Sequence, residues 1–351
     1  MISLVPAKRL GFPPMGCNRY SGPVVPLTEK ALIFHIRRTA IRRAGVATGI
    51  GDDSAVLRLP PGHEVLVTTD FSLEGIHFRR EWHAPEVVGH RCLARGLSDI
   101  AAMGGEPVAA FLSLALPRNL PQAWVRRFMK GLLALAGQFK VTLAGGDTAE
   151  SPVGILADIV VVGSVPTGKA LLRSGAQPGD RIYVTGELGG SSAALAELLA
   201  GRNIRPADFP LHFHPIPRLA VGRVLRQKRL ASALIDLSDG LSTDIAHICE
   251  ESETGAEILA PALPRARVGK RRSLVDLPHA LHGGEDYELL FTAPRNRRIS
   301  NRIAGVAVSL IGRVTRNQQV VLIDEDGLRR ELKSQGWEHF RKEPCAQRVT
   351  S

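Results

Sequence analysis

Cysteine is scarce in this chain of 351 residues. The four cysteines, Cys17, Cys92, Cys249 and Cys345, are far apart and form no CxxC pair. A zinc site or a disulfide framework needs several cysteines at short or regular spacings, so the sequence argues against both. Free thiols are typical of a reducing compartment, and we therefore expect a cytoplasmic protein.

Long apolar runs are also missing. The longest run, ILADIVVVGSV at 155–165, contains an aspartate and is too short to cross a bilayer, so it predicts a buried strand. The first 25 residues offer only ISLV as an apolar stretch, which is too short for a signal peptide. We expect no membrane contact and a flexible N-terminal extension over residues 1–27.

The chain has no excess of acid; it is basic. Its 45 Lys and Arg outnumber its 34 Asp and Glu, and basic residues cluster at 265–272 and 295–298. Such clusters can attract nucleic acid, or they can form an ordinary solvated surface. No aromatic residues are interleaved with the basic ones and no helix-turn-helix pattern is present. The pattern therefore favours a solvated surface, and we expect no nucleic-acid partner.

The remaining composition is typical of an α/β (α+β) protein with many tight turns, since 44% of residues are apolar and there are 35 Gly and 23 Pro. Helical and strand periods alternate along the chain. They predict a first domain over 28–165, a turn-rich join at 168–180 and a second domain over 166–345. Helices are expected at 28–43, 85–105, 122–139, 189–201 and 215–228. Strands are expected at 63–70, 107–117, 155–165, 181–186, 307–314 and 318–327. The segment 233–251 is expected to form a strand, a turn and a helix, and 283–293 a turn that leads into a strand.

Five short acidic motifs stand out against this basic background. Each places aspartate, in most cases beside a hydroxyl or glycine residue, near the end of a predicted strand or helix, where side chains can face a ligand. Carboxylate and hydroxyl oxygens suit Mg²⁺ or Ca²⁺, whereas zinc favours His and Cys. No P-loop (GxxxxGK[ST]) is present, so a nucleotide site would depend on metals and backbone N–H groups. The motifs are GDD (51–53), TTD (68–70), LSD (97–99), GGD (145–147) and DLSDG (236–240).

Each motif alone also has a purely structural explanation. Asp53 fits an ordinary turn and Asp239 fits a helix N-cap. Asp99 is harder to explain, because a negative charge late in a helix opposes the helix dipole unless a cation is bound. GGSSA at 189–193 could bind an anion at a helix start, or its serines could simply cap that helix. Asp244, one turn beyond DLSDG, is expected to be a surface residue.

Taken in order, the motifs resemble those of the thiamine-monophosphate kinase family. The matching stretches are GIGDDSAV, TTDFSLEGIHF, LSDIAAMGGEP, GGDT, ALLRSGAQPGD, DLSDG and GGEDYELLFT, and the match runs from about residue 28 to GWEHF at 336–340. The resemblance implies the two-domain aminoimidazole-ribonucleotide-synthetase-like fold, with mixed sheets packed with helices and a homodimer formed through the N-terminal domain. It also implies that ATP phosphorylates thiamine monophosphate to thiamine diphosphate.

The resemblance further implies a set of site residues, with several Mg²⁺ ions, ATP as co-substrate and no covalent catalytic residue. Substrate contacts would fall on His77, Glu285 and Trp337; for His77 and Trp337 a structural role is the alternative. Nucleotide contacts would fall on Gly146, Asp147, Arg173 and Ser238. Metal ligands would be Asp53, Thr68, Thr69, Asp70, Asp99, Asp147, Asp236 and Asp239.

Three rival interpretations are weaker. A selenophosphate synthetase would need a reactive cysteine with a nearby lysine, and Cys17 has no such lysine. The GGEDYEL and EGIHF motifs point away from it and also from an aminoimidazole-ribonucleotide synthetase. A non-catalytic nucleic-acid-binding or scaffold protein on the same fold would have little use for so many acidic side chains.

Overall fold

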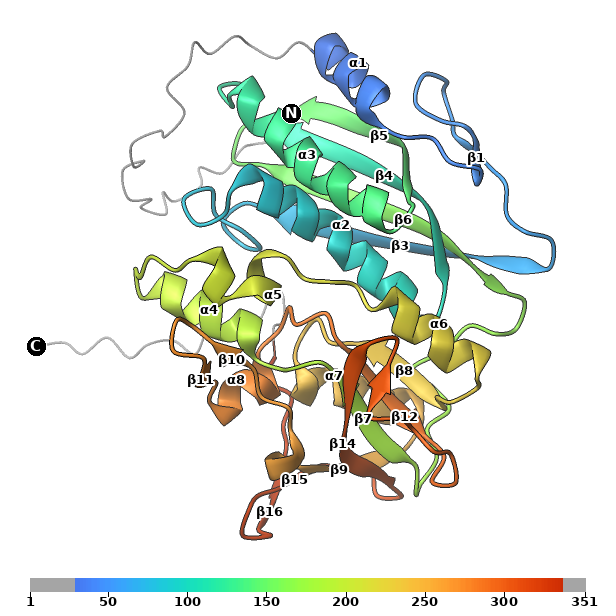
Figure 1. The fold of residues 1–351 in the computed structure, drawn as a ribbon, viewed down its shortest axis with the longest axis vertical. Coiled ribbons are helices and arrows are strands. Elements are labelled where there is room, and N and C mark those ends of the chain that lie inside the picture. Colours follow the sequence, from blue (N-terminus) through green and yellow to red (C-terminus); the bar gives the residue numbers. More distant parts are fainter. Residues whose placement is uncertain (1–28, 337–351) are drawn as a thin grey trace, which may run out of the picture.

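The computed structural model describes residues 29–336, and the N-terminal extension, Cys17, Trp337 and Cys345 lie outside this range. The first half of the chain forms one α/β unit and the second half forms another, drawn above and below each other in Figure 1. Within residues 29–336 no helix is both long enough and apolar enough to cross a membrane.

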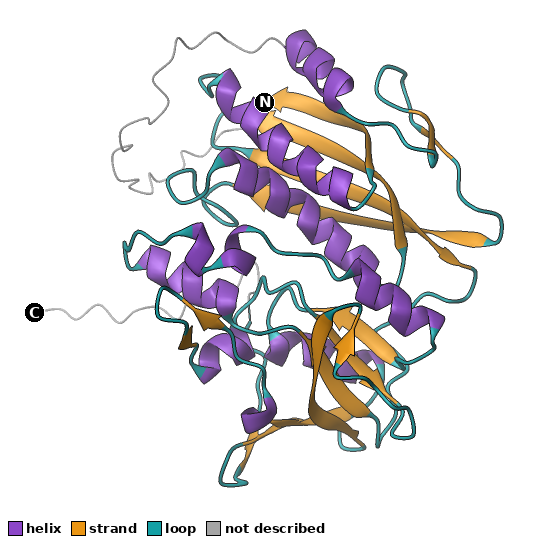
Figure 2. Cartoon of the chain, in the orientation of Figure 1, coloured by secondary structure: helices purple, strands orange, loops and turns teal. Residues whose placement is uncertain are grey.

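The N-terminal unit is built on a four-stranded sheet with the order β3-β6-β4-β5. β3 and β6 pair antiparallel, as do β6 and β4, whereas β4 and β5 pair parallel. Helices α2 and α3 lie side by side across one face of this sheet (Figure 2). The elements are α1 (Glu29–Thr39), β1 (Val46–Thr48), β2 (Val56–Leu57), β3 (His63–Leu73), α2 (Pro85–Ala102), β4 (Glu106–Leu116), α3 (Gln122–Gln138), β5 (Thr142–Glu150) and β6 (Leu156–Pro166).

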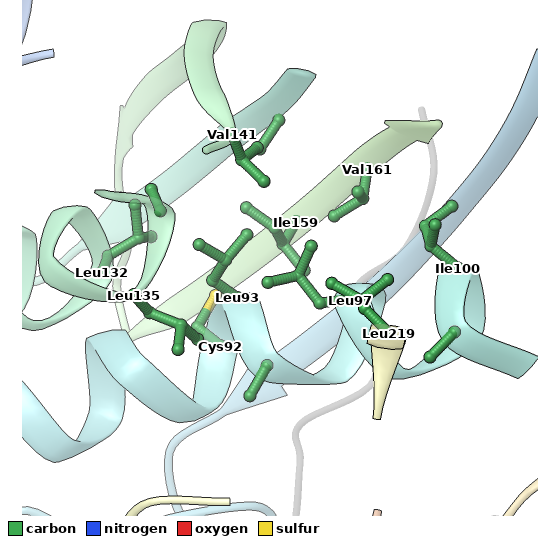
Figure 3. Close-up of a cluster of buried hydrophobic side chains, with 14 of the residues drawn as sticks. Cys92, Leu93, Leu97, Ile100, Leu132, Leu135, Val141, Ile159, Val161 and Leu219 are labelled. Carbon is green, nitrogen blue, oxygen red and sulfur yellow. The ribbon is translucent and has the colours of Figure 1, made fainter. Parts of the chain in front are cut away.

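The core of this unit lies between the two helices and the sheet. Along β6, Ala157, Ile159 and Val161 are fully buried and alternate with the half-buried Leu156, Asp158 and Val160, as expected for a strand with one covered face. Figure 3 shows Ile159 and Val161 facing Leu93 and Leu97 of α2. Ser98 and Asp99 follow the apolar Leu93 and Leu97 in the last turns of α2.

The C-terminal unit is built on an eight-stranded sheet with the order β16-β15-β9-β14-β7-β12-β8, to which β13 adds beside β14. All its pairs are antiparallel except β15 with β9. Its strands are β7 (Arg181–Thr185), β8 (Ala233–Asp236), β9 (Gly255–Leu259), β12 (Leu289–Ala293), β13 (Arg302–Ile303), β14 (Val306–Thr315), β15 (Val320–Ile323) and β16 (Arg329–Glu331). The remaining elements are α4 (Gly190–Leu199), α5 (Pro210–Phe213), α6 (Leu219–Gln227), α7 (Leu241–Glu251), α8 (Leu277–His282) and the small pair β10 (Arg267–Val268) and β11 (Ser273–Leu274).

The two units pack against each other through α2. Helix α6 and strand β8 of the C-terminal unit both contact α2, and Leu219 of α6 belongs to the same apolar cluster as the residues in Figure 3. This contact brings the end of β8, where DLSDG begins, beside the polar residues of α2.

Two expected helices are shorter than predicted. The helix expected over 28–43 ends at Thr39, and the one expected over 215–228 begins at Leu219. Pro215 and Pro217 explain the second difference, because proline disfavours helical backbone in the residue before it. The strand expected over 318–327 ends at Ile323, where the Asp324–Gly327 turn starts.

Candidate active site

Three carboxyl groups from distant parts of the chain meet where the two units touch. Asp70 lies near the end of β3, Asp99 lies in the last turns of α2, and Asp236 is the last residue of β8. The Thr68 hydroxyl donates a hydrogen bond to Asp99, and the Ser98 hydroxyl donates one to Asp236 at 2.7 Å. We call Asp70, Asp99 and Asp236 the acidic cluster of the candidate site.

The acidic cluster is electrostatically unfavourable in the protein alone. Burial and, after it, the Asp99 carboxylate raise the pKa of Asp70 to about 7. The same two causes raise the pKa of Asp236 to about 7. Burial also raises the pKa of Asp99, although Thr68 and Arg173 oppose that shift. Carboxyl groups that share a poorly solvated site in this way are stabilised by a cation.

The sheet separates this cluster from other residues expected to bind metal. Thr69 points to the opposite face of β3 from Thr68 and Asp70, where its hydroxyl donates to Asp158 of β6 at 2.7 Å. Asp158 pairs with Ser113 of β4, and Ser113 pairs with Asp147 of β5. Asp158 and Asp147 therefore lie in one row on the sheet face that α2 and α3 leave uncovered.

Gly146 has a structural reason to be glycine. Its φ is +148°, and a Cβ added there would lie 1.8 Å from the carbonyl oxygen of Leu112 on β4. The neighbouring Asp147 is exposed and accepts a hydrogen bond from the Thr148 N–H at 2.8 Å. Asp53 lies in the exposed turn between β1 and β2, and no described contact joins it to the acidic cluster.

The DLSDG segment is braced by the GGEDYE segment. The Glu285 N–H donates to the Ser238 carbonyl at 2.8 Å, and the Tyr287 N–H donates to the Leu237 carbonyl at 2.9 Å. Gly240 has a φ of +110°, and a Cβ there would lie 2.8 Å from the carbonyl carbon of His282. The two segments thus form one double loop, in which Ser238 is half-buried.

Two expectations for this loop are wrong. The N-cap of α7 is Gly240 and not Asp239. Asp244 is not a surface residue, because it is 1% exposed. Its carboxylate accepts the N–H groups of Gly240 at 3.0 Å and Asp239 at 3.3 Å, so it turns inward to hold the loop. Asp239, Asp244 and His247 also each offer a ligand atom within 4.8 Å of the others.

Glu285 and His77 lie beside one small cavity of about 10 Å³, together with Arg91 and Arg95 of α2. Glu285 accepts ion-paired hydrogen bonds from Arg91 at 2.6 Å and from Arg95 at 2.9 Å. Burial alone would raise the pKa of Glu285, but the two guanidinium groups outweigh it and hold this pKa well below its usual range. His77 accepts the Leu73 N–H at 3.0 Å. Two of the three expected substrate residues are thus neighbours, and the third, Trp337, lies outside the described residues.

Comparisons with known proteins agree with this architecture. Residues 51–165 match the model of the AIR synthase related protein N-terminal domain, and residues 177–325 match that of the C-terminal domain. The chain is 39% identical over 314 residues to the thiamine-monophosphate kinase of Escherichia coli K12, covering 86% of this chain and 95% of that one. It also resembles two solved structures. The thiamine-monophosphate kinase of Stenotrophomonas maltophilia is 36% identical, with a TM-score of 0.75 over 86% of this chain and 98% of that one. AaThiL complexed with AMPPCP and TMP is 32% identical, with a TM-score of 0.71 over 89% and 97%.

The chain belongs to the thiamine-monophosphate kinase family. The resemblance predicted from the motifs is confirmed, as is the fold of two α/β units with mixed sheets packed with helices.

Several polar residues of the site were missed by the sequence reasoning. Asp158 interrupts the apolar run at 155–165, and a polar residue inside a predicted buried strand is the signal that could have identified it. Arg91 and Arg95 gave a weaker signal, as two cations four residues apart in an apolar helix. Arg95 also donates to the Tyr287 hydroxyl at 2.9 Å, which ties α2 to the double loop.

The segment 189–193, which the sequence offered as either an anion site or a serine cap, is filled by the protein itself. The Asp286 carboxylate accepts the Gly189 N–H at 2.7 Å and the Ser191 N–H at 3.5 Å, at the start of α4. The N-cap of α4 is Gly189, without a side-chain cap. In this family member, neither the anion site nor the serine cap is therefore present.

Proposed function

We propose that this protein transfers the γ-phosphoryl group of ATP to thiamine monophosphate, giving ADP and thiamine diphosphate for thiamine diphosphate biosynthesis. The observation that carries the proposal is the acidic cluster of Asp70, Asp99 and Asp236, assembled from both units. The thiamine-monophosphate kinase relatives and the AMPPCP and TMP complex of AaThiL support it.

The donor set of the acidic cluster fits Mg²⁺. Its ligands would be hard oxygen atoms, and a divalent cation would stabilise the ionised forms of Asp70 and Asp236, whose pKa values burial and the Asp99 carboxylate raise. We propose that Thr68, Asp70, Asp99 and Asp236 hold one part of the metal set. Asp239 and Asp147 are proposed for the remainder, together with Thr69 and Asp53. When bound, Mg²⁺ would neutralise phosphate oxygens and allow two anions to approach.

The side chains of the chain itself would bind and orient the reactants. The acceptor is a phosphate monoester that is largely dianionic at pH 7, so its oxygen needs no strong general base. Arg173 is exposed near Asp99 and Asp236 and can contact a phosphate of the nucleotide. Gly146, Asp147 and Ser238 would complete the nucleotide contacts. We propose direct in-line transfer without a phosphorylated enzyme.

Glu285 and His77 are proposed to orient thiamine monophosphate, with Trp337 as a third contact. The ion pairs with Arg91 and Arg95 keep Glu285 ionised and fix its position between the two units. An ionised, immobilised carboxylate suits recognition of a cationic or hydrogen-bond-donating ring system.

A homodimer is proposed to form through the open face of the N-terminal sheet. Val65, Val67 and Phe71 of β3 are 55%, 65% and 54% exposed on that face. An edge strand with exposed apolar residues is a ready site for pairing with a second copy. Sedimentation velocity should show a species of about twice 37.9 kDa, and a monomer at micromolar concentration would contradict the dimer.

A cytoplasmic location is proposed as well, because Cys92 and Cys249 are both free thiols.

A coupled assay of ADP release tests the activity. We expect release that requires both thiamine monophosphate and Mg²⁺, and its absence with purified full-length protein would refute the kinase function. Asp239→Asn should lower kcat by about a hundredfold or more with an unchanged circular dichroism spectrum, as expected for the loss of a metal-binding charge. Asp326→Asn, in an exposed turn of the C-terminal unit, is the matched control and should leave kcat unchanged.

A further inference from the structure

A pocket of about 410 Å³ opens beside the segment that joins α1 to β1. It is larger than the cavity at Glu285, and none of the expected site residues lines it. Its lining residues are Arg42, Arg43, Ala44, Val46, Ala47 and Arg58.

The three arginines of this pocket have no acidic partner. None of the lining residues is acidic, and across residues 29–336 no ion pair involves Arg42, Arg43 or Arg58. Like charges repel, so three guanidinium groups around one space raise the free energy of the protein unless an anion offsets them. The arrangement is the electrostatic opposite of the acidic cluster.

Arg43 gives a second, independent observation. Its Nε–H is buried and has no hydrogen-bond partner, and its Nη2 reaches only the Gly137 carbonyl at 3.4 Å. The backbone of Arg43 is held in place, because its N–H donates to the Thr142 hydroxyl at 3.0 Å. A buried donor without an acceptor raises the free energy of the protein, and an acceptor atom of a ligand would remove that cost.

We propose that this pocket binds the phosphate group of a small anionic molecule. Guanidinium groups match phosphate oxygens in geometry as well as in charge. The volume falls within the range of small-molecule sites. No aromatic side chain lines the pocket, so it lacks the stacking surface on which single-stranded nucleic acid binds.

This phosphate pocket is separate from the candidate active site. Thr142, which anchors Arg43, is the first residue of β5, and Asp147 lies five residues further along that strand. At about 3.3 Å per residue, the two positions are roughly 17 Å apart. The proposal is therefore independent of the kinase function, and either can fail without the other.

Calorimetric titration of the full-length protein with inorganic pyrophosphate tests the proposal. The titration is done in EDTA and at low salt, because the metal-free acidic cluster repels anions and leaves the arginine pocket as the binding site. Arg42→Gln and Arg58→Gln each remove one charge from an exposed side chain that makes no ion pair. Arg298→Gln is the matched control, since it removes an exposed charge from the C-terminal unit. Orthophosphate and AMP are titrated in the same way, to separate free phosphate from a phosphorylated nucleoside.

We expect Arg42→Gln and Arg58→Gln each to weaken pyrophosphate binding about tenfold, equivalent to ~1.4 kcal/mol, and Arg298→Gln to leave it unchanged. ADP release with thiamine monophosphate should stay at the wild-type rate in all three variants. Equal affinity in all four proteins, or no heat of binding in the wild type, would overturn the proposal. So would duplex DNA binding that the two pocket variants abolish while pyrophosphate does not bind.

Discussion

The buried ion pair between Arg218 and Glu288 offers the sharpest test of how the double loop is held. Glu288 is fully buried, and its carboxylate accepts hydrogen bonds from the Arg218 Nε at 2.7 Å and from the Thr185 hydroxyl at 2.6 Å. A further bond joins Arg218 Nη2 to the other carboxylate oxygen. Arg218 lies just before α6, and Glu288 lies between the GGEDY turn and β12. The pair therefore anchors the loop that carries Glu285.

Replacing Glu288 by Gln should destabilise the protein by about 3–5 kcal/mol. The substitution keeps the side-chain volume but leaves the Arg218 guanidinium in the interior without a countercharge, and a broken buried pair costs about this much. The double variant Arg218→Met/Glu288→Gln should recover about 2 kcal/mol or more of that loss, because it removes the unpaired charge as well. Glu325→Gln, at an exposed turn, is the matched control and should change stability by less than about 0.5 kcal/mol.

Urea denaturation followed by circular dichroism measures these free energies of unfolding. If Glu288→Gln cost less than about 1 kcal/mol, the pair would contribute little to the fold and the reasoning from burial would be refuted. Additive effects in the double variant would refute it too, because independent residues show no coupling energy.

Two further predictions concern carboxyl groups that hold N–H groups of loops. Burial raises the pKa of Asp286 from 3.8 to about 8, so the folded protein keeps a proton that the unfolded chain releases, and its stability falls as the pH rises between these values. Asp286→Asn keeps an acceptor for the Gly189 N–H but has no group that titrates at this position. Between pH 6 and pH 8 the free energy of unfolding of the wild type should therefore fall by about 2–3 kcal/mol relative to that of the variant. The same pH slope in both proteins, measured by urea denaturation, would contradict this. Asp244→Ala leaves the N–H groups of Asp239 and Gly240 without their acceptor and should lower the free energy of unfolding by about 2 kcal/mol. Asp244→Asn, which keeps an acceptor oxygen, should lose less, and an equal loss in the two variants would show that the hydrogen bonds are not the cause.

Much of the fold was open to prediction from local pattern. The helix over 85–102 and the strand over 156–166 follow from apolar periodicity and from Pro85 and the Gly104–Gly105 pair at the helix ends. Their lengths agree with the expectation to within a few residues. The last residues of α1 did not agree, because weakly apolar helix ends depend on what packs against them. The first residues expected for α6 did not agree either, because Pro215 and Pro217 delay its start to Leu219.

The interior orientation of Asp244 was not open to prediction in the same way. An aspartate one turn into an amphipathic helix is exposed in most proteins, and the prediction followed that tendency. In the structure its carboxylate faces the N–H groups of Asp239 and Gly240, which the sharp turn at Gly240 directs toward the helix start. That direction depends on the GGEDYE segment, about 45 residues further along the chain, pressing against the turn.

The sequence by itself determined the family of this protein and predicted the kind of site it carries. The order of the acidic motifs identified the family, and the oxygen-rich side chains at strand and helix ends indicated a metal-dependent phosphate site. Residue type and local spacing carry that information, because hard oxygen ligands and chain turns are properties of short segments.

Only the tertiary structure decided which of these residues meet. Alternation along β3 puts Thr68 and Asp70 on one face and Thr69 on the other, but the packing of α2 decided which face would share the acidic cluster. The Thr69 hydroxyl donates a hydrogen bond to Asp158, and the Gly189 N–H at the start of α4 donates one to Asp286. In each pair the two residues are about 90 positions apart in the sequence. Such contacts depend on strand order and on the docking of the two units, which are long-range packing events that no local pattern encodes.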